Sequence, residues 1–444
     1  MVQQTDVLEM ELERAAIPGT SLKVSRVALG TWAIGGWMWG GTDEAESVAT
    51  IRAAVEHGIN VIDTAPAYGF GRSEEIVGKA LAEGGLRSRV LIATKVGLEW
   101  KDGNVFRNAS RARIMREIED SLRRLRTDHI DIYQVHWPDP RVDIEETAEA
   151  MQALFQQGKI RAIGVSNFSV EQMQQFRRVA PLHVLQPPYN LFERGIEADV
   201  LPYCRKNGIA TFGYGALCRG LLSGRMRPDS KFEGDDLRRS DPKFQQPRFA
   251  QYLAAVERFD CLARQRFGKP VIELAVRWTL DQGITTALWG ARHPGQLQPV
   301  DGVSGWSIDA AAKAEMERIL KETLTDPLVQ NSWPRRRAAW RRELNKRTVL
   351  CGRQSRGNDT RLSRREHGTG PKRSGKRRTV VSSSPLPSLS RKRRIAKGRS
   401  RSCAALARES CSGFRDSRQW QHRCSFERTD AERLSILLPR AAGG

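Results

Sequence analysis

The stretch Ser47–Asp63, SVATIRAAVEHGINVID, contains a complete helix-to-strand unit and decides the fold class. Its first part, Ser47–His57, has apolar residues three and four positions apart, which is typical of one face of an amphipathic helix. Gly58 ends the predicted helix, and the apolar run Ile59–Asp63 follows as a short buried strand. A helix that feeds a short apolar strand in this way is the building unit of a parallel α/β protein.

The same unit repeats along the chain. Five further helical patterns are each followed by a strand pattern. The helical patterns are at Ile76–Leu81, Arg113–Leu125, Thr147–Phe155, Val170–Val179 and Ala198–Lys206. The strand patterns that follow them, in the same order, are at Val90–Thr94, Ile130–Val135, Ile160–Val165, Val184–Gln186 and Ile209–Phe212. An opening strand near Val27–Thr31 and a last one near Thr285–Leu288 make eight. This number predicts a closed (β/α)8 TIM barrel. A doubly wound sheet is the alternative, but the glycine-rich turn Gly69-Phe70-Gly71 has Glu74 where that fold's dinucleotide fingerprint needs a third glycine.

Two segments fall outside the repeat. Leu12–Arg26, with Pro18-Gly19 at its centre, predicts a β-hairpin ahead of the barrel, where it would plug the bottom. Ser223–Arg248 is long, charged and rich in proline and glycine, which indicates a loop over the barrel rim.

The positive charge belongs to the end of the chain. The 444 residues carry a formal net charge of +22 and are 39% hydrophobic. Residues 331–444 contain 31 of the 73 Lys and Arg residues but only 8 of the 51 Asp and Glu residues. Residues 1–330 therefore contain 42 basic and 43 acidic residues and are nearly neutral. We therefore expect an N-terminal extension at 1–14, a barrel at 15–326 and a basic, disordered tail at 327–444.

Two explanations of this tail stay open. Clusters such as Arg391-Lys392-Arg393-Arg394 are typical of segments that bind nucleic acid, and elsewhere in the chain we expect no nucleic-acid partner. The abrupt change of composition after Pro327 instead favours a frameshifted or misannotated extension. A neighbouring reading frame that continues a short ending after Pro327 would support the frameshift.

No segment predicts export or membrane insertion. Residues 1–6 lack a basic start followed by an apolar block, and no run approaches the ~20 apolar residues that span a bilayer. The seven cysteines include no C-x-x-C pair, so reduced thiols are expected. We expect a soluble, cytoplasmic protein.

Polar side chains stand where apolar strands end. Asp63, Lys95 and His136 end the second, third and fourth predicted strands, and Tyr68 follows Asp63 by five residues. In a barrel, the carboxyl ends of the strands form the face that carries the active site. Any one of these residues alone is more often structural, but all four at one rim favour catalysis.

With its flanking residues, the order Asp63, Tyr68, Lys95, His136 resembles the aldo-keto reductase superfamily over about residues 15–325. The nearest members are bacterial reductases related to the potassium-channel β subunits and general stress reductases, whose late cofactor segment is similar to Trp289–Gln296. The resemblance implies an NADP-dependent oxidoreductase that reduces aldehydes or ketones with NADPH, without metal or flavin.

These residue types suit the implied reaction. Hydride transfer to a carbonyl creates an alkoxide, so a proton donor must lie beside that oxygen. Tyr68 is the expected acid, and the ammonium of Lys95 is expected to lower the pKa of this phenol. Asp63 would keep Lys95 protonated and oriented, and His136 would orient the carbonyl through a hydrogen bond.

The same resemblance implies the cofactor site. Ser166, Asn167 and Gln186 would bind the nicotinamide carboxamide, and Tyr214 would stack on the nicotinamide ring. Arg292, in a loop that leads into a helix N-terminus, would bind the 2′-phosphate of NADPH. The other expected contacts are Thr31, Trp32, Asp63, Gly215, Ala216, Leu217, Arg219, Gly220, Gly290 and Gln296.

The expected substrate contacts are Trp32 and Trp137, with Tyr68 and His136. An apolar pocket of this kind favours small aromatic or aliphatic carbonyls.

Alternatives stay open for the cofactor and for the function of the protein. If Arg292 is instead a surface arginine that binds no ligand, no preference for NADPH over NADH is expected. Channel β subunits also show that such a barrel can bind NADPH with slow turnover as a regulatory subunit. The physiological substrate and the oligomeric state are not predicted.

Overall fold

The computed structural model describes residues 12–325 and residue 327. Eight parallel strands close into a barrel in the order β10-β11-β12-β3-β4-β5-β8-β9. They are β3 (Val27–Gly30), β4 (Val61–Asp63), β5 (Leu91–Val96), β8 (Ile132–Val135), β9 (Ile163–Ser166), β10 (Val184–Gln186), β11 (Ala210–Gly213) and β12 (Thr286–Gly290). Each lies close to its predicted bounds, which confirms the TIM barrel and excludes the doubly wound sheet.

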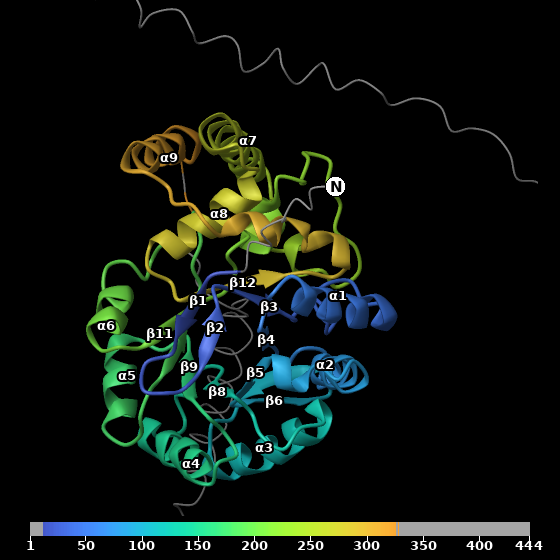
Figure 1. Ribbon diagram of the computed structural model, residues 1–444, viewed down its shortest axis with the longest axis vertical. Coiled ribbons are helices and arrows are strands. Elements are labelled where there is room, and N and C mark those ends of the chain that lie inside the picture. Colours follow the sequence, from blue (N-terminus) through green and yellow to red (C-terminus); the bar gives the residue numbers. More distant parts are fainter. Residues whose placement is uncertain (1–11, 326, 328–444) are drawn as a thin grey trace, which may run out of the picture. The chain divides into compact units, whose positions relative to one another are not determined.

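Helices surround these strands (Figure 1). Those that connect successive barrel strands up to β11 are α1 (Glu44–Glu56), α2 (Arg72–Glu83), α3 (Arg111–Leu125), α4 (Ile144–Gln156), α5 (Val170–Arg177) and α6 (Val200–Lys206). Further along are α7 (Arg248–Phe267), α8 (Val271–Asp281) and α9 (Ala310–Thr323). Side-chain caps explain several helix starts, because Asp43, Ser110 and Asp309 each accept a hydrogen bond from a backbone amide three residues on.

The predicted N-terminal hairpin is present and closes one end of the barrel. Its strands β1 (Arg14–Ala16) and β2 (Lys23–Ser25) pair antiparallel. Ile17, Leu22 and Val24 are buried in one apolar cluster with inward residues of the barrel strands, such as Val61 and Ile132. The hairpin therefore plugs the barrel as expected, at the end opposite to the carboxyl ends of the strands.

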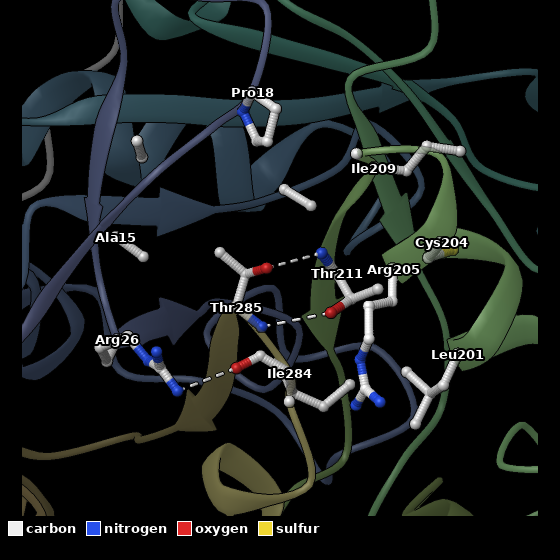
Figure 2. Close-up of a pocket in the computed structure, with 14 residues that line it drawn as sticks. Ala15, Pro18, Arg26, Leu201, Cys204, Arg205, Ile209, Thr211, Ile284 and Thr285 are labelled. Carbon is white, nitrogen blue, oxygen red and sulfur yellow. Dashed lines mark hydrogen bonds between the residues drawn. The ribbon is translucent and has the colours of Figure 1, made fainter.

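A cavity of about 270 Å³ lies between this hairpin and the amino ends of β11 and β12 (Figure 2). Its polar groups bond to one another. Arg26 donates to the backbone oxygen of Ile284 over 3.2 Å, and the backbone amides of Thr211 and Thr285 each donate to the other's hydroxyl. The cavity is a feature of the plugged end, away from the predicted catalytic residues.

The opposite rim holds segments that the strand repeat does not predict. A hairpin of β6 (Leu98–Lys101) and β7 (Asn104–Arg107) follows β5. The predicted rim loop Ser223–Arg248 is confirmed as largely irregular, with the 3₁₀ turns η3 (Leu237–Arg239) and η4 (Pro242–Phe244). Another 3₁₀ turn, η2 (Cys218–Ser223), leads into it. After β12 come two more 3₁₀ segments, η5 (Pro294–Gln296) and η6 (Gln298–Val303).

The predicted extension and tail fall largely on residues 1–11 and 328–444, which lie outside the described residues. Both therefore stay predictions. Within the part of the chain that the structure describes, no helix is long and apolar enough to cross a membrane.

Candidate active site

Lys95 connects the candidate catalytic residues. Its amine donates to Oδ1 of Asp63 over 2.6 Å and to the phenol oxygen of Tyr68 over 3.2 Å. A third hydrogen bond, over 3.0 Å, goes to the backbone oxygen of Thr64, so each N–H group of the ammonium has an acceptor. The ring of His136 lies 5.8 Å from the ring of Tyr68, nearly perpendicular to it. The structure thus brings together the four residues that the sequence places at one rim.

The turn after β4 holds Tyr68 in place. Its backbone amide donates to the oxygen of Ala65 over 3.0 Å, and its backbone oxygen accepts from the amide of Ser73 over 3.1 Å. The hydroxyl of Ser73 lies 2.7 Å from that of Thr31 and 2.9 Å from that of Thr64. This buried hydroxyl cluster ties β3 and β4 to the start of α2. Thr31, an expected cofactor contact, is fully buried within it.

The ionisation of Tyr68 reflects a competition between burial and charge. Burial raises the pKa of the phenol, the charge of Lys95 lowers it and that of Asp63 raises it, so the pKa lies above its ordinary value. Lys95 thus lowers the pKa of the phenol as expected from the sequence, but desolvation of the buried phenol, which that expectation did not include, has the larger effect. Burial also lowers the pKa of Lys95, but its attraction to Asp63 and Tyr68 prevails and raises that pKa above its ordinary value. Lys95 is thus a cation and Tyr68 a neutral acid at neutral pH.

His136 is neutral at the same pH. Burial, assisted by repulsion from Lys95, lowers the pKa of the imidazole well below its ordinary value. The backbone of His136 is fixed by two bonds, since its amide donates to the oxygen of Val96 and its oxygen accepts from the side chain of Asn167. A neutral imidazole in this position can donate one hydrogen bond to a carbonyl oxygen.

The residues expected around a nicotinamide lie together. The amide nitrogen of Asn167 donates to the hydroxyl of Ser166 over 2.9 Å, and the hydroxyl of Tyr214 donates to the amide oxygen of Asn167 over 2.9 Å. Asn167 has a φ of 64°, a left-handed conformation that asparagine tolerates better than most residues. Gln186 is adjacent through its backbone oxygen, which accepts from Ser166, but its side-chain amide donates to Oδ2 of Asp63 over 2.7 Å.

The segment after Tyr214 turns sharply. Gly215 has a φ of 73°, and its backbone oxygen accepts from the side chain of Asn190 over 2.9 Å. Ala216 is buried and Leu217 partly so, and the amide of Gly220 donates to the oxygen of Leu217 over 2.9 Å. Arg219, an expected cofactor contact, forms an ion pair with Asp241 of the rim loop.

Arg292 connects the loop after β12 to the loop after β3. Its guanidinium donates to the backbone oxygens of Trp39 and Gly41 over 3.1 and 2.8 Å, and its amide donates to the side chain of Gln296 over 2.7 Å. Both guanidinium acceptors are neutral, and among the described residues Arg292 forms no ion pair. Gly290 is exposed, with no atom within 4 Å of the position of an added Cβ. The helix N-terminus expected here is only the 3₁₀ turn η5.

Aromatic side chains line the rim around Tyr68. The ring of Trp32 stacks on that of Tyr68 with centroids 6.0 Å apart, and the ring of Trp39 meets Trp32 edge-on at 5.5 Å. The guanidinium of Arg107, on β7, lies 5.2 Å from the ring of Trp137. The structure adds two aromatic residues, Phe70 and Trp100, that the sequence does not point to. The ring centroid of Phe70 lies 5.0 Å from that of Trp37 and 5.8 Å from that of Trp100 on β6.

This set of groups fits a nicotinamide dinucleotide. Tyr214 offers an aromatic face beside the hydroxyl and amide groups of Ser166 and Asn167, which match a flat ring with a carboxamide. Arg292 offers a guanidinium that forms no ion pair with the described carboxylates, although its charge also acts on Asp236, and such a group suits a phosphate. The described residues contain no group of three or more His, Cys, Asp and Glu side chains that could hold a metal ion.

Comparison with known proteins agrees with this geometry. Residues 26–321 match the model of the aldo/keto reductase family. The chain is 60% identical over 318 residues to the aldo-keto reductase YhdN of Bacillus subtilis, covering 71% of this chain and 96% of that protein. It is 34% identical over 330 residues to an NADH-specific methylglyoxal reductase of Escherichia coli, covering 70% and 99%.

A solved structure is also similar. The glycerol dehydrogenase of Gluconobacter oxydans matches with a TM-score of 0.66 and 55% identity, over 72% of this chain and 98% of that one. These relatives are oxidoreductases, and the family pairs a nicotinamide cofactor with a carbonyl or alcohol substrate. Since the match spans most of the chain and the relatives are covered almost end to end, the chain belongs to the aldo/keto reductase family.

Proposed function

We propose that the protein reduces aldehydes or ketones to alcohols with NADPH, and that Tyr68 gives the proton to the carbonyl oxygen. The observation that carries this proposal is the buried ammonium of Lys95, which lies within hydrogen-bond distance of both Asp63 and the phenol of Tyr68. An acid that must release a proton inside a protein needs a nearby positive charge to stabilise its anion.

Each side chain has a distinct part in the proposed reaction. His136 donates a hydrogen bond to the carbonyl oxygen and orients it beside Tyr68. The bound nicotinamide supplies the hydride. As negative charge develops on the oxygen, Tyr68 passes its proton there, and Lys95 stabilises the phenolate that remains. Asp63 balances the charge of Lys95 and holds its amine toward Tyr68.

The cofactor is proposed to lie over the carboxyl ends of β9 to β12. Ser166 and Asn167, with Gln186, would hold the carboxamide, and Tyr214 would cover the ring. The rest of the dinucleotide would be bordered by Gly215, Ala216, Leu217, Arg219, Gly220 and Gly290, and it would also contact Trp32 and Gln296. Arg292 would bind the 2′-phosphate, and its contacts with Trp39 and Gly41 fix the guanidinium while leaving other N–H groups for phosphate oxygens.

The substrate is proposed to be a small carbonyl compound. Trp32, Trp37, Trp100 and Trp137 provide apolar surface around Tyr68, which favours aliphatic or aromatic groups over charged ones. The names of two relatives point to small polar molecules, methylglyoxal for one and glycerol for the other. A test panel should therefore contain both short hydroxylated and aromatic carbonyls.

The experiment is an assay of this panel with NADPH and with NADH. Tyr68→Phe is expected to lower kcat by about 100-fold or more while leaving the cofactor dissociation constant nearly unchanged. Tyr203→Phe makes the same change on α6, where the hydroxyl accepts a hydrogen bond from the surface residue Arg177, and serves as the control. Unchanged turnover in Tyr68→Phe would refute the assignment. A wild-type protein that binds NADPH but reduces no carbonyl at an appreciable rate would instead be a regulatory subunit.

A further inference from the structure

Hydrogen-bonding side chains fill the barrel interior beside the catalytic residues. Asp63, Lys95, Gln134 and Gln186 come from β4, β5, β8 and β10, and all four are buried. The side-chain nitrogen of Gln134 donates to Oδ2 of Asp63 over 3.3 Å. That of Gln186 donates to the same oxygen over 2.7 Å and to the amide oxygen of Gln134 over 3.3 Å. Two linked amides therefore face the side of Asp63 that Lys95 does not occupy.

The barrel makes room for Gln134 at a particular position. Gln134 pairs in register with Lys95 on one side and with Gly164 of β9 on the other. A Cβ at Gly164 would lie 2.7 Å from Cγ of Gln134, too close for a real contact. The absence of a side chain at Gly164 thus allows the amide of Gln134 to lie where it meets Asp63 and Gln186.

The amides matter because Asp63 is buried. A carboxylate withdrawn from water keeps its charge only where donors replace the lost hydration. Lys95 satisfies Oδ1, and Gln134 with Gln186 satisfies Oδ2. The same bonds prevent the carboxylate from rotating, so that Oδ1 stays toward Lys95.

We propose that Gln134 is a positioning residue for the reduction, and that its amide holds the carboxylate of Asp63 oriented so that Lys95 can support proton transfer from Tyr68. The proposal rests on the proposed function where it takes Tyr68 as the proton donor. A glutamine inside an otherwise apolar strand is not needed to pack the barrel, since apolar side chains of similar volume would fill the space without a cost of desolvation.

Loss of the Gln134 amide has a definite effect on Tyr68. Without this amide, the charge of Asp63 is less dispersed and opposes ionisation of the phenol more strongly. The titratable groups that face Tyr68 are Asp63, Lys95, His136 and Tyr214, and the change at Asp63 raises the pKa of Tyr68.

The test is Gln134→Met, which keeps the length of the side chain and removes its N–H donors. Ionisation of Tyr68 is followed by the ultraviolet absorbance of the phenolate, as the difference between each protein and its Tyr68→Phe counterpart. We expect the midpoint to move to higher pH, kcat to fall about tenfold, and the KM for NADPH to stay within about twofold. Gln157→Met, the same change at the exposed end of α4, is the control.

The possible outcomes separate this proposal from the proposed function. An unchanged Tyr68 midpoint together with unchanged kcat in folded Gln134→Met overturns the role of Gln134. If the wild type reduces no carbonyl, the proposed function fails, but the titration still decides whether Gln134 acts on Tyr68. Should Gln134→Met not fold, Gly164→Ala displaces the same amide with one methyl group and is expected to shift the midpoint in the same direction. No shift there would equally contradict the proposal.

Discussion

Gly35 lies so close to Tyr68 that a Cβ on Gly35 would sit 2.7 Å from both the backbone carbon and the backbone oxygen of Tyr68. The loop after β3 therefore packs directly against the backbone of Tyr68, the proposed acid. No side chain fits between the two segments at this point.

Gly35→Ala is expected to displace Tyr68 and to destabilise the fold by about 1–3 kcal/mol, the usual cost of overpacking. The carbonyl-reduction kcat should fall more than the affinity for NADPH, because Tyr68 moves and the proposed phosphate contacts do not. Gly30→Ala is a matched control, since its added methyl would meet its nearest atoms at 3.8 Å. Equal kcat in the two variants would show that the close approach does not position Tyr68.

The barrel is expected to be complete without the basic tail. Met316 and Ile319 of α9 are buried in the apolar cluster that also contains residues of α7 and α8, and the family match ends at residue 321. A chain that ends after Pro327 should therefore keep the melting temperature and the kcat of the full chain. Loss of either would place part of residues 328–444 in the folded domain. A polyanion that binds the full chain and not the shortened one would place that binding in residues 328–444.

The sequence predicts the barrel because each strand is a short apolar run, such as Ile59–Asp63, preceded by an amphipathic helix. It also predicts that Lys95 and His136 share a rim, since parallel strands bring their carboxyl ends to one face. It cannot predict the amide direction of Gln186 or the contact of Gln134 with Asp63. Those depend on register and on the space that Gly164 leaves, which only the closed barrel defines.

The β6–β7 hairpin carried a signal that the sequence analysis did not use. Asp102-Gly103 is a two-residue turn between strands in which Lys101 pairs with Asn104, and both turn residues have positive φ, 51° and 73°. Its strands are short and partly exposed, so hydrophobic periodicity alone does not reveal them. The missed hairpin carries Trp100, which extends the aromatic rim.

Arg292→Ala is expected to weaken NADPH binding by about tenfold or more, because a hydrogen-bonded charge pair contributes ~1.5–3 kcal/mol. NADH lacks the 2′-phosphate, so its dissociation constant should change far less. Arg238→Ala removes a charge from the same rim, where Arg238 lies over the ring of Trp39 and pairs with Asp236, and is the control. Equal losses for both cofactors in Arg292→Ala would assign Arg292 to holding the loop at Trp39 and Gly41 instead. Titration of cofactor fluorescence measures the NADPH and NADH dissociation constants of the wild type and of both variants.

The pH dependence of reduction follows from the states of Tyr68 and His136. Reduction needs a protonated Tyr68, and burial raises the pKa of this phenol above its ordinary value of about 10, so activity should fall only at strongly alkaline pH. Alcohol oxidation needs the phenolate, so its rate should rise over the same pH range.

His136 stays neutral because burial lowers its pKa well below 6.5, so kcat/KM for reduction should show no inflection near that pH. Profiles of wild type and His136→Asn at saturating NADPH measure this. An inflection near pH 6.5 that disappears in His136→Asn would mean that the imidazole titrates in the working enzyme and that burial does not keep it neutral.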